Sequence, residues 1–163
     1  SQPSFLKVLK EYPNMVVLQT FSKAWGSAGV RLGMAFASED IIKIFNKVKY
    51  PYNVNVLTQR YAIKLLDNFS QVEKKVKAIL KNREKLEKQL AKVKCIKEVY
   101  PTDANFILVK TIDSDAIYKY LIEKGIVARN RNGITLCDNC LRITVGTAEE
   151  NKQVIAALKN FSK

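Results

Sequence analysis

The sequence predicts an α/β protein in which a sheet is covered by helices. Apolar runs of strand length alternate with segments whose apolar residues recur at helical spacing, and turn-forming residues separate them. The 47% hydrophobic content supplies a core for a chain of 163 residues, a size that typically buries about 68–70% of its unfolded surface. We therefore expect one folded domain together with part of another, and no intrinsic disorder.

The composition excludes several kinds of chemistry. The chain has no histidine, which rules out Ser-His-Asp and Cys-His catalysis and histidine-metal sites. Any catalysis must use Lys, Arg, Tyr, Cys or carboxylates. No apolar run approaches the roughly 20 residues that span a bilayer, and the three cysteines cannot all pair with one another. We therefore expect a soluble protein with no membrane partner, in a reducing, cytoplasmic compartment.

The first 50 residues predict a short helix, two strands and a second helix. An amphipathic helix at residues 5–9 precedes an apolar run, Met15–Leu18, that we interpret as a buried strand. A glycine-rich turn leads to a second buried strand, Gly33–Ala37, and Ser38 is the expected cap of the next helix. Because two strands do not form an independent sheet, residues 1–50 are interpreted as the remnant of a larger domain.

The rest of the chain predicts a connecting segment and a small α/β domain. Residues 51–69 contain a proline turn and a helical pattern, and residues 70–163 form the domain. Thr147 with Glu150 makes a capping box at the start of the last helix. After a long helix, the domain's expected strands lie at residues 98–100, 106–110, 126–129 and 141–145, and its expected later helices at 115–124 and from 147 to the end.

The long helix carries much of the net charge of +13. Ser70 with Glu73 makes a capping box at its expected start. Between Glu73 and Glu98 there are ten basic and four acidic residues. One apolar stripe on this helix contains Val72, Val76, Ile79, Leu86, Leu90 and Val93. Most of the lysines lie off that stripe, and no nucleic-acid-binding motif accompanies them, so we expect a solvated face and no nucleic acid partner. A basic module that docks nucleic acid or an acidic partner remains the alternative.

The segment Thr20–Gly33 is the most informative for function. Lys23 stands where a strand ends, small residues follow it, and Arg31 lies eight positions later. Glycines let the backbone approach a ligand, and hydroxyls and a guanidinium donate well to a phosphate. Burial and a nearby cation favour an uncharged lysine, which a Schiff-base lysine must be. A chain this rich in lysine also places some after strands with no chemical role.

This segment resembles the cofactor-lysine motif of the fold-type I pyridoxal-phosphate aminotransferases. Four further segments resemble the histidinol-phosphate aminotransferases of that group, in the same order, and they are Pro51–Asn55, Ala104–Val109, Gly125–Arg129 and Cys140–Thr147. The resemblance extends over essentially the whole chain but corresponds only to the C-terminal half of the family. It implies that residues 1–50 belong to the large cofactor-binding domain and the rest mainly to the small domain.

The resemblance also implies roles for individual residues. Lys23 would bind pyridoxal 5′-phosphate covalently and act as base and acid in the proton shift, while Ser22, Arg31 and Thr20 would hold the phosphate. Arg142 resembles the arginine that binds the substrate carboxylate, and Arg129 the one that reaches the phosphate of histidinol phosphate. A planar fork of donors suits both tasks.

The strand pattern around Arg142 supports its role independently. Leu141, Ile143 and Val145 share one face of the expected strand, so Arg142 points to the other. From periodicity alone, that other face is either solvent or the floor of a cleft. The resemblance favours the cleft.

The implied activity is the transamination of L-histidinol phosphate with 2-oxoglutarate, yielding glutamate, in histidine biosynthesis by a homodimer. The family's first half supplies the aspartate that pairs with the pyridine nitrogen, so this chain alone is expected to be inactive. Two alternatives stay open. The parent is an aromatic or other class II amino-acid aminotransferase, or it is a regulatory paralogue that kept the fold and lost activity.

Cys137 and Cys140 form a C-x-x-C motif that we do not assign to redox or zinc chemistry. Zinc needs four ligands, and Cys95 is the one other cysteine. A thioredoxin-like motif stands between a strand and a helix, whereas a strand is expected after Cys140. We expect no metal site and interpret Cys140 as a small residue that leads into the strand.

Overall fold

The computed structural model describes residues 3–161, which form two compact units that meet between Lys74 and Lys75. Residues 1–2 and 162–163, at the ends of the predicted 1–50 and 70–163 regions, lie outside the described residues. The long helix α3 (Phe69–Leu90) begins in the first unit and continues in the second. No helix in the described part of the chain is long and apolar enough to cross a membrane.

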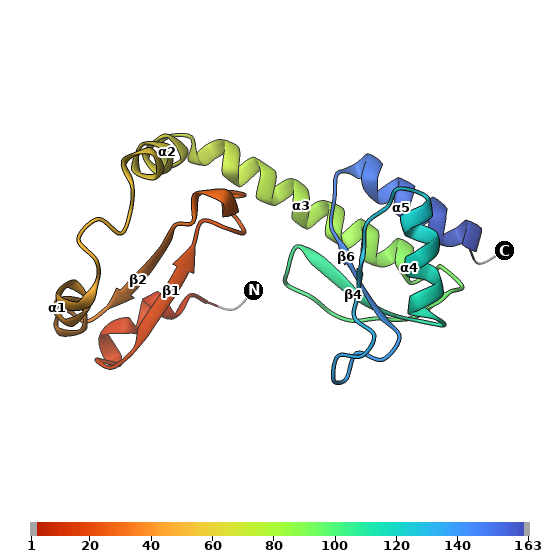
Figure 1. Ribbon diagram of the computed structural model, residues 1–163, viewed down its shortest axis with the longest axis horizontal. Helices are drawn as coiled ribbons and strands as arrows, with labels where there is room; N and C mark the ends of the chain where they lie inside the picture. The colour runs from red at the N-terminus through yellow and green to blue at the C-terminus, as the bar shows by residue number, and fades with distance from the viewer. Residues whose placement is uncertain (1–2, 162–163) are drawn as a thin grey trace. The chain divides into compact units, whose positions relative to one another are not determined.

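The first unit contains an antiparallel pair of strands and the helices that precede and follow it (Figure 1). Thr20 pairs with Gly33 at the end of this ladder, and Val16 pairs with Ala37 at the other end. The elements are the 3-10 helix η1 (Phe5–Glu11), β1 (Val16–Thr20), the short 3-10 helix η2 (Ala28–Val30), β2 (Gly33–Ala37), α1 (Glu39–Val48) and α2 (Val56–Asp67). The predicted order of helix, strand, strand and helix is confirmed.

The predicted burial of the first strand is wrong. Leu18, in the middle of β1, is 76% exposed, and no residue of β1 is buried. The second strand is only half-buried, apart from the exposed Gly33. A lone pair of strands presents two faces and two edges, which is more surface than the helices of a small unit can cover.

Two predicted helix starts also need correction. Ser38 is the N-cap of α1, but its hydroxyl donates to the carbonyl of Pro13 (3.0 Å) and does not cap the helix. The predicted capping box of Ser70 and Glu73 is wrong, because α3 already begins at Phe69. Asn68 alone separates α2 from α3, and its side chain donates to the carbonyl of Lys64 (2.8 Å). The chain therefore enters the long helix directly from the end of the preceding one.

The second unit is an antiparallel four-stranded sheet of order β3-β4-β6-β5 with helices packed against it. Its elements are β3 (Ile96–Val99), β4 (Phe106–Thr111), α4 (Ser114–Glu123), β5 (Arg129–Asn130), β6 (Cys140–Thr144) and α5 (Ala148–Phe161). The strand predicted at residues 126–129 is shorter and later than expected. The N–H of Ile126 donates to Leu121 at the end of α4 (2.8 Å), so the chain joins the ladder only at Arg129.

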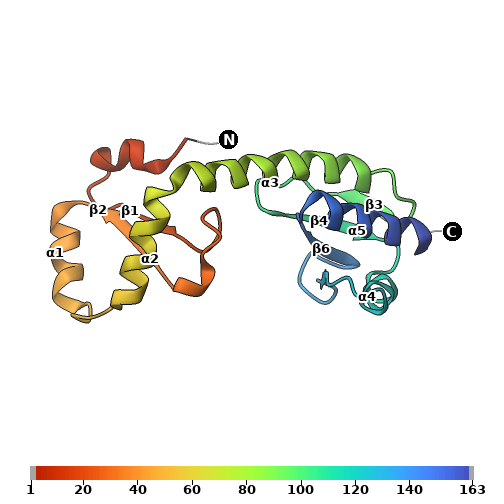
Figure 2. The ribbon, with the colours of Figure 1, turned by 90° about the horizontal axis from the view of Figure 1, so that it is seen from above.

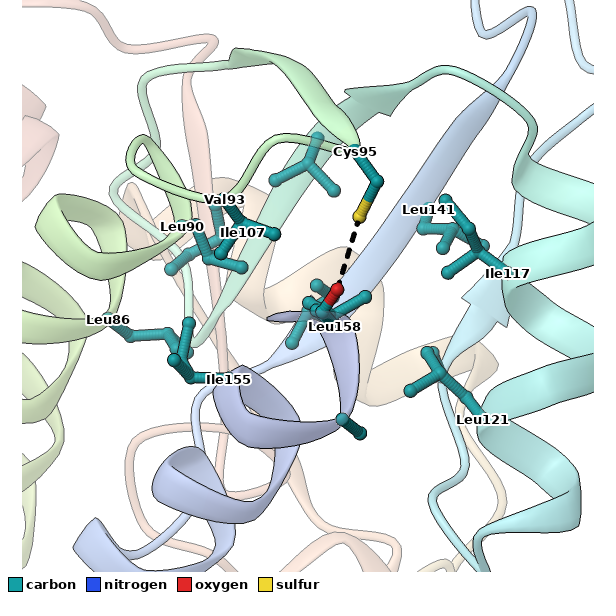
Figure 3. Close-up of a cluster of buried hydrophobic side chains, with 14 of the residues drawn as sticks. Leu86, Leu90, Val93, Cys95, Ile107, Ile117, Leu121, Leu141, Ile155 and Leu158 are labelled. Atoms are coloured by element: carbon teal, nitrogen blue, oxygen red, sulfur yellow. Dashed lines mark hydrogen bonds between the residues drawn. The ribbon is translucent and has the colours of Figure 1, made fainter. Parts of the chain in front are cut away.

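One face of this sheet and three helices enclose the core. Figure 3 shows Leu158 of α5 between side chains of α3 and side chains of α4, and Figure 2 shows α5 between these two helices. The residues that are fully buried there include Leu86, Leu90, Ile107, Val109, Ile117, Leu121, Leu141 and Leu158. Leu86 and Leu90 confirm the predicted apolar stripe of the long helix. Its exposed lysines include Lys81, Lys85 and Lys88, which confirms that they lie on a solvated face.

Candidate functional site

The segment Thr20–Gly33, which we call the lysine loop, closes the β1–β2 ladder. Beyond the pair Thr20–Gly33, the N–H of Phe21 donates to the carbonyl of Leu32 (3.1 Å). The ladder therefore brings the two ends of the loop together.

Two hydroxyl groups stand at the beginning of the lysine loop. The Oγ1 of Thr20 accepts a hydrogen bond from the N–H of Ser22 (3.1 Å) and lies 2.9 Å from the Oγ of Ser22. It also lies 3.3 Å from the carbonyl oxygen of Leu32, on the opposite side of the loop. The Thr20 hydroxyl donates to the Oγ of Ser22, so the backbone turn holds the two hydroxyls side by side and leaves the Ser22 hydroxyl to donate to an anion.

Arg31, the third candidate donor, lies at the other end of the loop. Its backbone is left-handed (φ 53°), which is uncommon for a residue with a side chain. Its Nη1 donates to the carbonyl of Ala28 (3.0 Å), and the side chain is otherwise exposed. A guanidinium carries five N–H donors, so most of the fork is available to a ligand.

Lys23 lies at the exposed tip of a turn. Its carbonyl accepts from the N–H of Gly26 (2.9 Å), and its side chain is exposed. The expected burial of Lys23 is therefore not found within this chain. The buried residues of the loop are Phe21 and Ser27, which are 4% and 5% exposed. Their side chains anchor the loop in the first unit.

Aromatic side chains pack against one another beside the lysine loop. The ring of Trp25 lies 5.0 Å from that of Phe21 and 5.5 Å from that of Phe69 at the start of α3. The hydroxyl of Ser27 donates to the carbonyl of Trp25 (3.0 Å) and lies 3.4 Å from the hydroxyl of Tyr61 on α2. Nothing local in the sequence indicates that α3 and α2 contact Trp25 and Ser27.

A second group of candidate residues lies on the sheet face that points away from the core. Leu141 and Ile143 of β6 are buried, whereas Arg142 is half-buried on the opposite face, as the alternation predicted. The guanidinium of Arg142 lies over the ring of Phe106 (4.8 Å to the centroid), and its buried Nε has no hydrogen-bond partner among the described residues. Such an orphaned donor is an indication of a ligand site.

The register of the sheet brings the two predicted substrate arginines together. Arg129 of β5 pairs with Arg142 of β6, and residues directly opposite in an antiparallel pair share a face. Arg129 is exposed. Beside them is a hollow of about 250 Å³ whose walls are formed by Phe106, Leu108, Arg131, Ile134, Cys137 and Arg142. The sequence analysis did not single out Arg131, although its spacing from Arg129 is that of one strand face.

The C-x-x-C motif forms one turn at the edge of this hollow. The N–H of Cys140 donates to the carbonyl of Cys137 (3.0 Å), and both thiols are free. Burial raises the pKa of the Cys140 thiol, and the adjacent Cys137 acts in the same direction. Among residues 3–161, no group of three or more potential ligands could hold a metal ion. Cys140 begins β6 as a buried residue, in agreement with its interpretation as a packing residue.

The chemistry of each group follows from its donors. The lysine loop combines an exposed primary amine with two hydroxyls and a guanidinium, which suits a ligand that has an anionic group and a carbonyl carbon for the amine. The arginine-bearing sheet face suits a carboxylate or phosphate. The two groups belong to different units.

Comparisons with known proteins show the family of the chain. A family model described as aminotransferase class I and II matches residues 2–158. The chain is 55% identical over 159 residues to the histidinol-phosphate aminotransferase of Bacteroides thetaiotaomicron, which covers 98% of this chain and 46% of that protein. The chain thus spans about half the length of the curated relatives it matches.

Solved structures resemble the chain over a similar share. The histidinol-phosphate aminotransferase of Clostridium acetobutylicum matches with a TM-score of 0.88 and 26% identity, over 98% of this chain and 49% of that one. A histidinol-phosphate aminotransferase from Sinorhizobium meliloti, solved with pyridoxal 5′-phosphate, matches with a TM-score of 0.74 and 22% identity, over 91% of this chain and 41% of that one. This second likeness concerns the fold alone.

Proposed function

The chain belongs to the class I and II aminotransferases, and from this membership we propose that it is part of an enzyme that transfers an amino group between L-histidinol phosphate and 2-oxoglutarate. One observation carries the reaction class: the turn after β1 presents Lys23 beside the hydroxyls of Thr20 and Ser22, in a loop closed by Arg31. The 55% identity to a histidinol-phosphate aminotransferase supports the choice of substrate. An aromatic or other class II aminotransferase remains the alternative.

The residues of the lysine loop fit pyridoxal 5′-phosphate. The two adjacent hydroxyls and the guanidinium of Arg31 match the acceptor oxygens of a phosphate, and the Nζ of Lys23 matches the aldehyde. When bound, this cofactor supplies an electron sink for the electrons of a broken bond at the substrate carbon. We assign Lys23 to the covalent attachment and Ser22, Thr20 and Arg31 to the phosphate.

Lys23 also has the proton-transfer role in this proposal. With substrate bound, its Nζ would take the proton from the substrate carbon that bears the amino group, as a base, and would return a proton at a second atom, as an acid. A free amine on a flexible stem suits both steps, because one atom must reach two positions. The exposed position of the side chain supports such movement.

Arg142 and Arg129 orient the substrate. We assign Arg142 to the carboxylate of glutamate and 2-oxoglutarate, and Arg129 to the phosphate of histidinol phosphate. Their opposed positions on one sheet face and the unpartnered Nε of Arg142 support this assignment. The two arginines thus allow one site to accept two substrates with different anionic groups.

The complete enzyme needs more than this chain. The aspartate that tunes the cofactor ring comes from outside the chain in this proposal, so the chain alone is inactive. We propose a homodimer, and we assign the strongly exposed Tyr50, Tyr52 and Leu57 to contacts made in the assembled enzyme. The three cysteines, which cannot all pair with one another, support a reducing, cytoplasmic location.

Reductive labelling of the complete protein that contains this sequence tests the proposal. Incubation with pyridoxal 5′-phosphate and borohydride, followed by peptide mass spectrometry, is expected to label Lys23 selectively. The Lys23→Ala variant should lose the label and the transamination of histidinol phosphate, whereas Lys119→Ala, on α4, should keep both. Labelling spread evenly over many lysines contradicts the reaction class, and a preference for aromatic amino acids over histidinol phosphate contradicts the substrate.

A further inference from the structure

We propose that Arg131 is a third anion-binding arginine on the face that carries Arg129 and Arg142, and that it makes the site selective for a phosphate monoester over a carboxylate. This inference rests on the proposed function, because it concerns the same substrate site. It adds a residue whose role is to distinguish one substrate from the other.

The strand register places Arg131 on this face. The N–H of Arg131 donates to the carbonyl of Cys140 (2.9 Å), which continues the ladder beyond the pairs Arg129–Arg142 and Asn130–Leu141. Because side chains alternate along a strand, Arg129 and Arg131 point to one side and Asn130 to the other. The side chain of Asn130 indeed donates to Asp115 on α4, which packs on the core side. Three guanidinium groups therefore share the outer face.

Arg131 and Arg142 converge on the same hollow of about 250 Å³. Both side chains are half-buried, and the guanidinium of Arg142 is held over Phe106. A water molecule occupies about 30 Å³ in the liquid, so the hollow has room for a group much larger than one water. The buried Nε of Arg142, unpartnered among the described residues, lies at this site. An anion in the hollow would contact both guanidinium groups.

The charge of this face calls for an anion. No ion pair in the described part of the chain involves Arg129, Arg131 or Arg142. Asp138 lies in the turn between Cys137 and Cys140 at the edge of the hollow, and Asp115 accepts hydrogen bonds from Asn130 and Asn132 on the other side of β5. Like charges that face each other across strands destabilise a sheet. A doubly charged ligand would relieve this repulsion more than a singly charged one.

Hydrogen bonds hold the segment that carries Arg131 in place. The side chain of Asn132 donates to Asp115 (2.9 Å) and accepts from the N–H of Asn139 (3.1 Å). The carbonyl of Asn139 in turn accepts from the N–H of Thr111 (2.8 Å). The loop between β5 and β6 is thus tied to its surroundings on both sides of Arg131, which lowers the entropy cost of binding through this side chain.

Selectivity between phosphate and carboxylate follows from the number of guanidinium groups that the acceptor oxygens of each can engage. One guanidinium satisfies a carboxylate with two parallel hydrogen bonds, so Arg142 is sufficient for glutamate. A phosphate monoester carries about two charges and three acceptor oxygens at neutral pH, which a second and a third fork can use. Loss of Arg131 should therefore weaken the binding of the phosphate substrate much more than the binding of the carboxylate substrate.

Kinetics of the complete enzyme provide the first test. For Arg131→Gln we expect kcat/KM for histidinol phosphate to fall about 10- to 100-fold, the range for a lost hydrogen bond to a charged group, and kcat/KM for glutamate to change less than about threefold. Arg131→Lys keeps the charge but lacks the planar guanidinium. Its kcat/KM for histidinol phosphate should lie between those of the unchanged enzyme and Arg131→Gln. The control Lys119→Gln removes one exposed positive charge from α4 and should change neither value. Equal losses for both substrates, or no loss, overturn the proposal.

A binding measurement separates this inference from the proposed function. Inorganic phosphate and acetate are titrated into the 163-residue chain, with NMR of the arginine side chains as the readout. Phosphate should bind more tightly than acetate, and Arg131→Gln should remove that preference while circular dichroism shows an intact fold. If the unchanged enzyme does not transaminate histidinol phosphate, the proposed function fails, yet a phosphate preference that depends on Arg131 still supports the inference. An unchanged preference in Arg131→Gln overturns it.

Discussion

Arg129 and Arg142 stand directly opposite one another in the β5–β6 pair, two positive charges on one face of a sheet. Opposed like charges cost a sheet stability, by roughly 0.2–1 kcal/mol for a cross-strand pair. A ligand site explains why the two arginines face each other, because a bound anion offsets their repulsion.

The repulsion between Arg129 and Arg142 leads to a prediction about the folding stability of the chain. Arg129→Gln should raise the free energy of unfolding of the chain by roughly 0.2–1 kcal/mol in a buffer without multivalent anions. The gain should shrink as phosphate is added, because the unchanged protein then gains more from the anion. Urea unfolding followed by circular dichroism measures both effects. A loss of stability in phosphate-free buffer would show that the two arginines do not repel each other.

A second prediction concerns the geometry of Arg142. In the complete enzyme, Arg142→Lys keeps the charge but removes the planar fork and its stacking on Phe106. We expect kcat/KM for glutamate to fall about tenfold or more, since a bidentate contact becomes a single one. Steady-state kinetics with glutamate as the amino donor provide the measurement. Activity equal to that of the unchanged enzyme would remove Arg142 from the carboxylate site.

The capping box of the last helix predicts a response to acid. The N–H of Thr147 donates to Glu150 (2.7 Å), and the N–H of Glu150 lies 3.3 Å from the hydroxyl of Thr147. The backbone hydrogen bond, helped by the hydroxyl, lowers the pKa of Glu150 from its usual value near 4.5. Its stabilising contribution is therefore complete above pH 4.5 and is lost as the pH falls through the lowered value.

Glu150→Gln isolates that contribution, because glutamine keeps the shape and cannot titrate. The unchanged chain should lose more stability than the variant between neutral pH and the acid side of pH 4.5. Chemical unfolding of both proteins across this range provides the comparison. Parallel curves would mean that the carboxylate is not held by Thr147 in the folded protein.

Gly125 supports a fourth prediction. It follows α4 with φ at +73°, and a Cβ added there would meet no atom within 4 Å. The cost of Gly125→Ala is therefore conformational, about 1 kcal/mol or slightly more. Gly29→Ala is the matched control, because that glycine also has open space and no positive φ. Denaturant unfolding should separate the two variants, and equal stabilities would contradict the conformational argument.

The order of the elements follows from the sequence alone. The alternation of Leu141, Arg142 and Ile143 predicted which side chains of β6 are buried, and the capping box of Thr147 and Glu150 predicted where α5 begins. These features depend on residues within a few positions of one another, where side-chain periodicity and cap geometry decide the outcome. The same local logic failed at Ser70, because α3 begins directly after Asn68.

Only the tertiary structure decided which distant residues meet. Nothing in the sequence sets the register that opposes Arg129 to Arg142, and a slip of one residue would have sent Arg131 to the core side and Asn130 to the outer face. Hydrogen bonds from Asn130 and Asn132 to Asp115, far from β5 in sequence, help to fix that register. The exposure of Leu18 likewise depends on what covers the sheet. The register of strands joined by long loops depends on many such contacts together. A local pattern of residues does not show which distant residues make them.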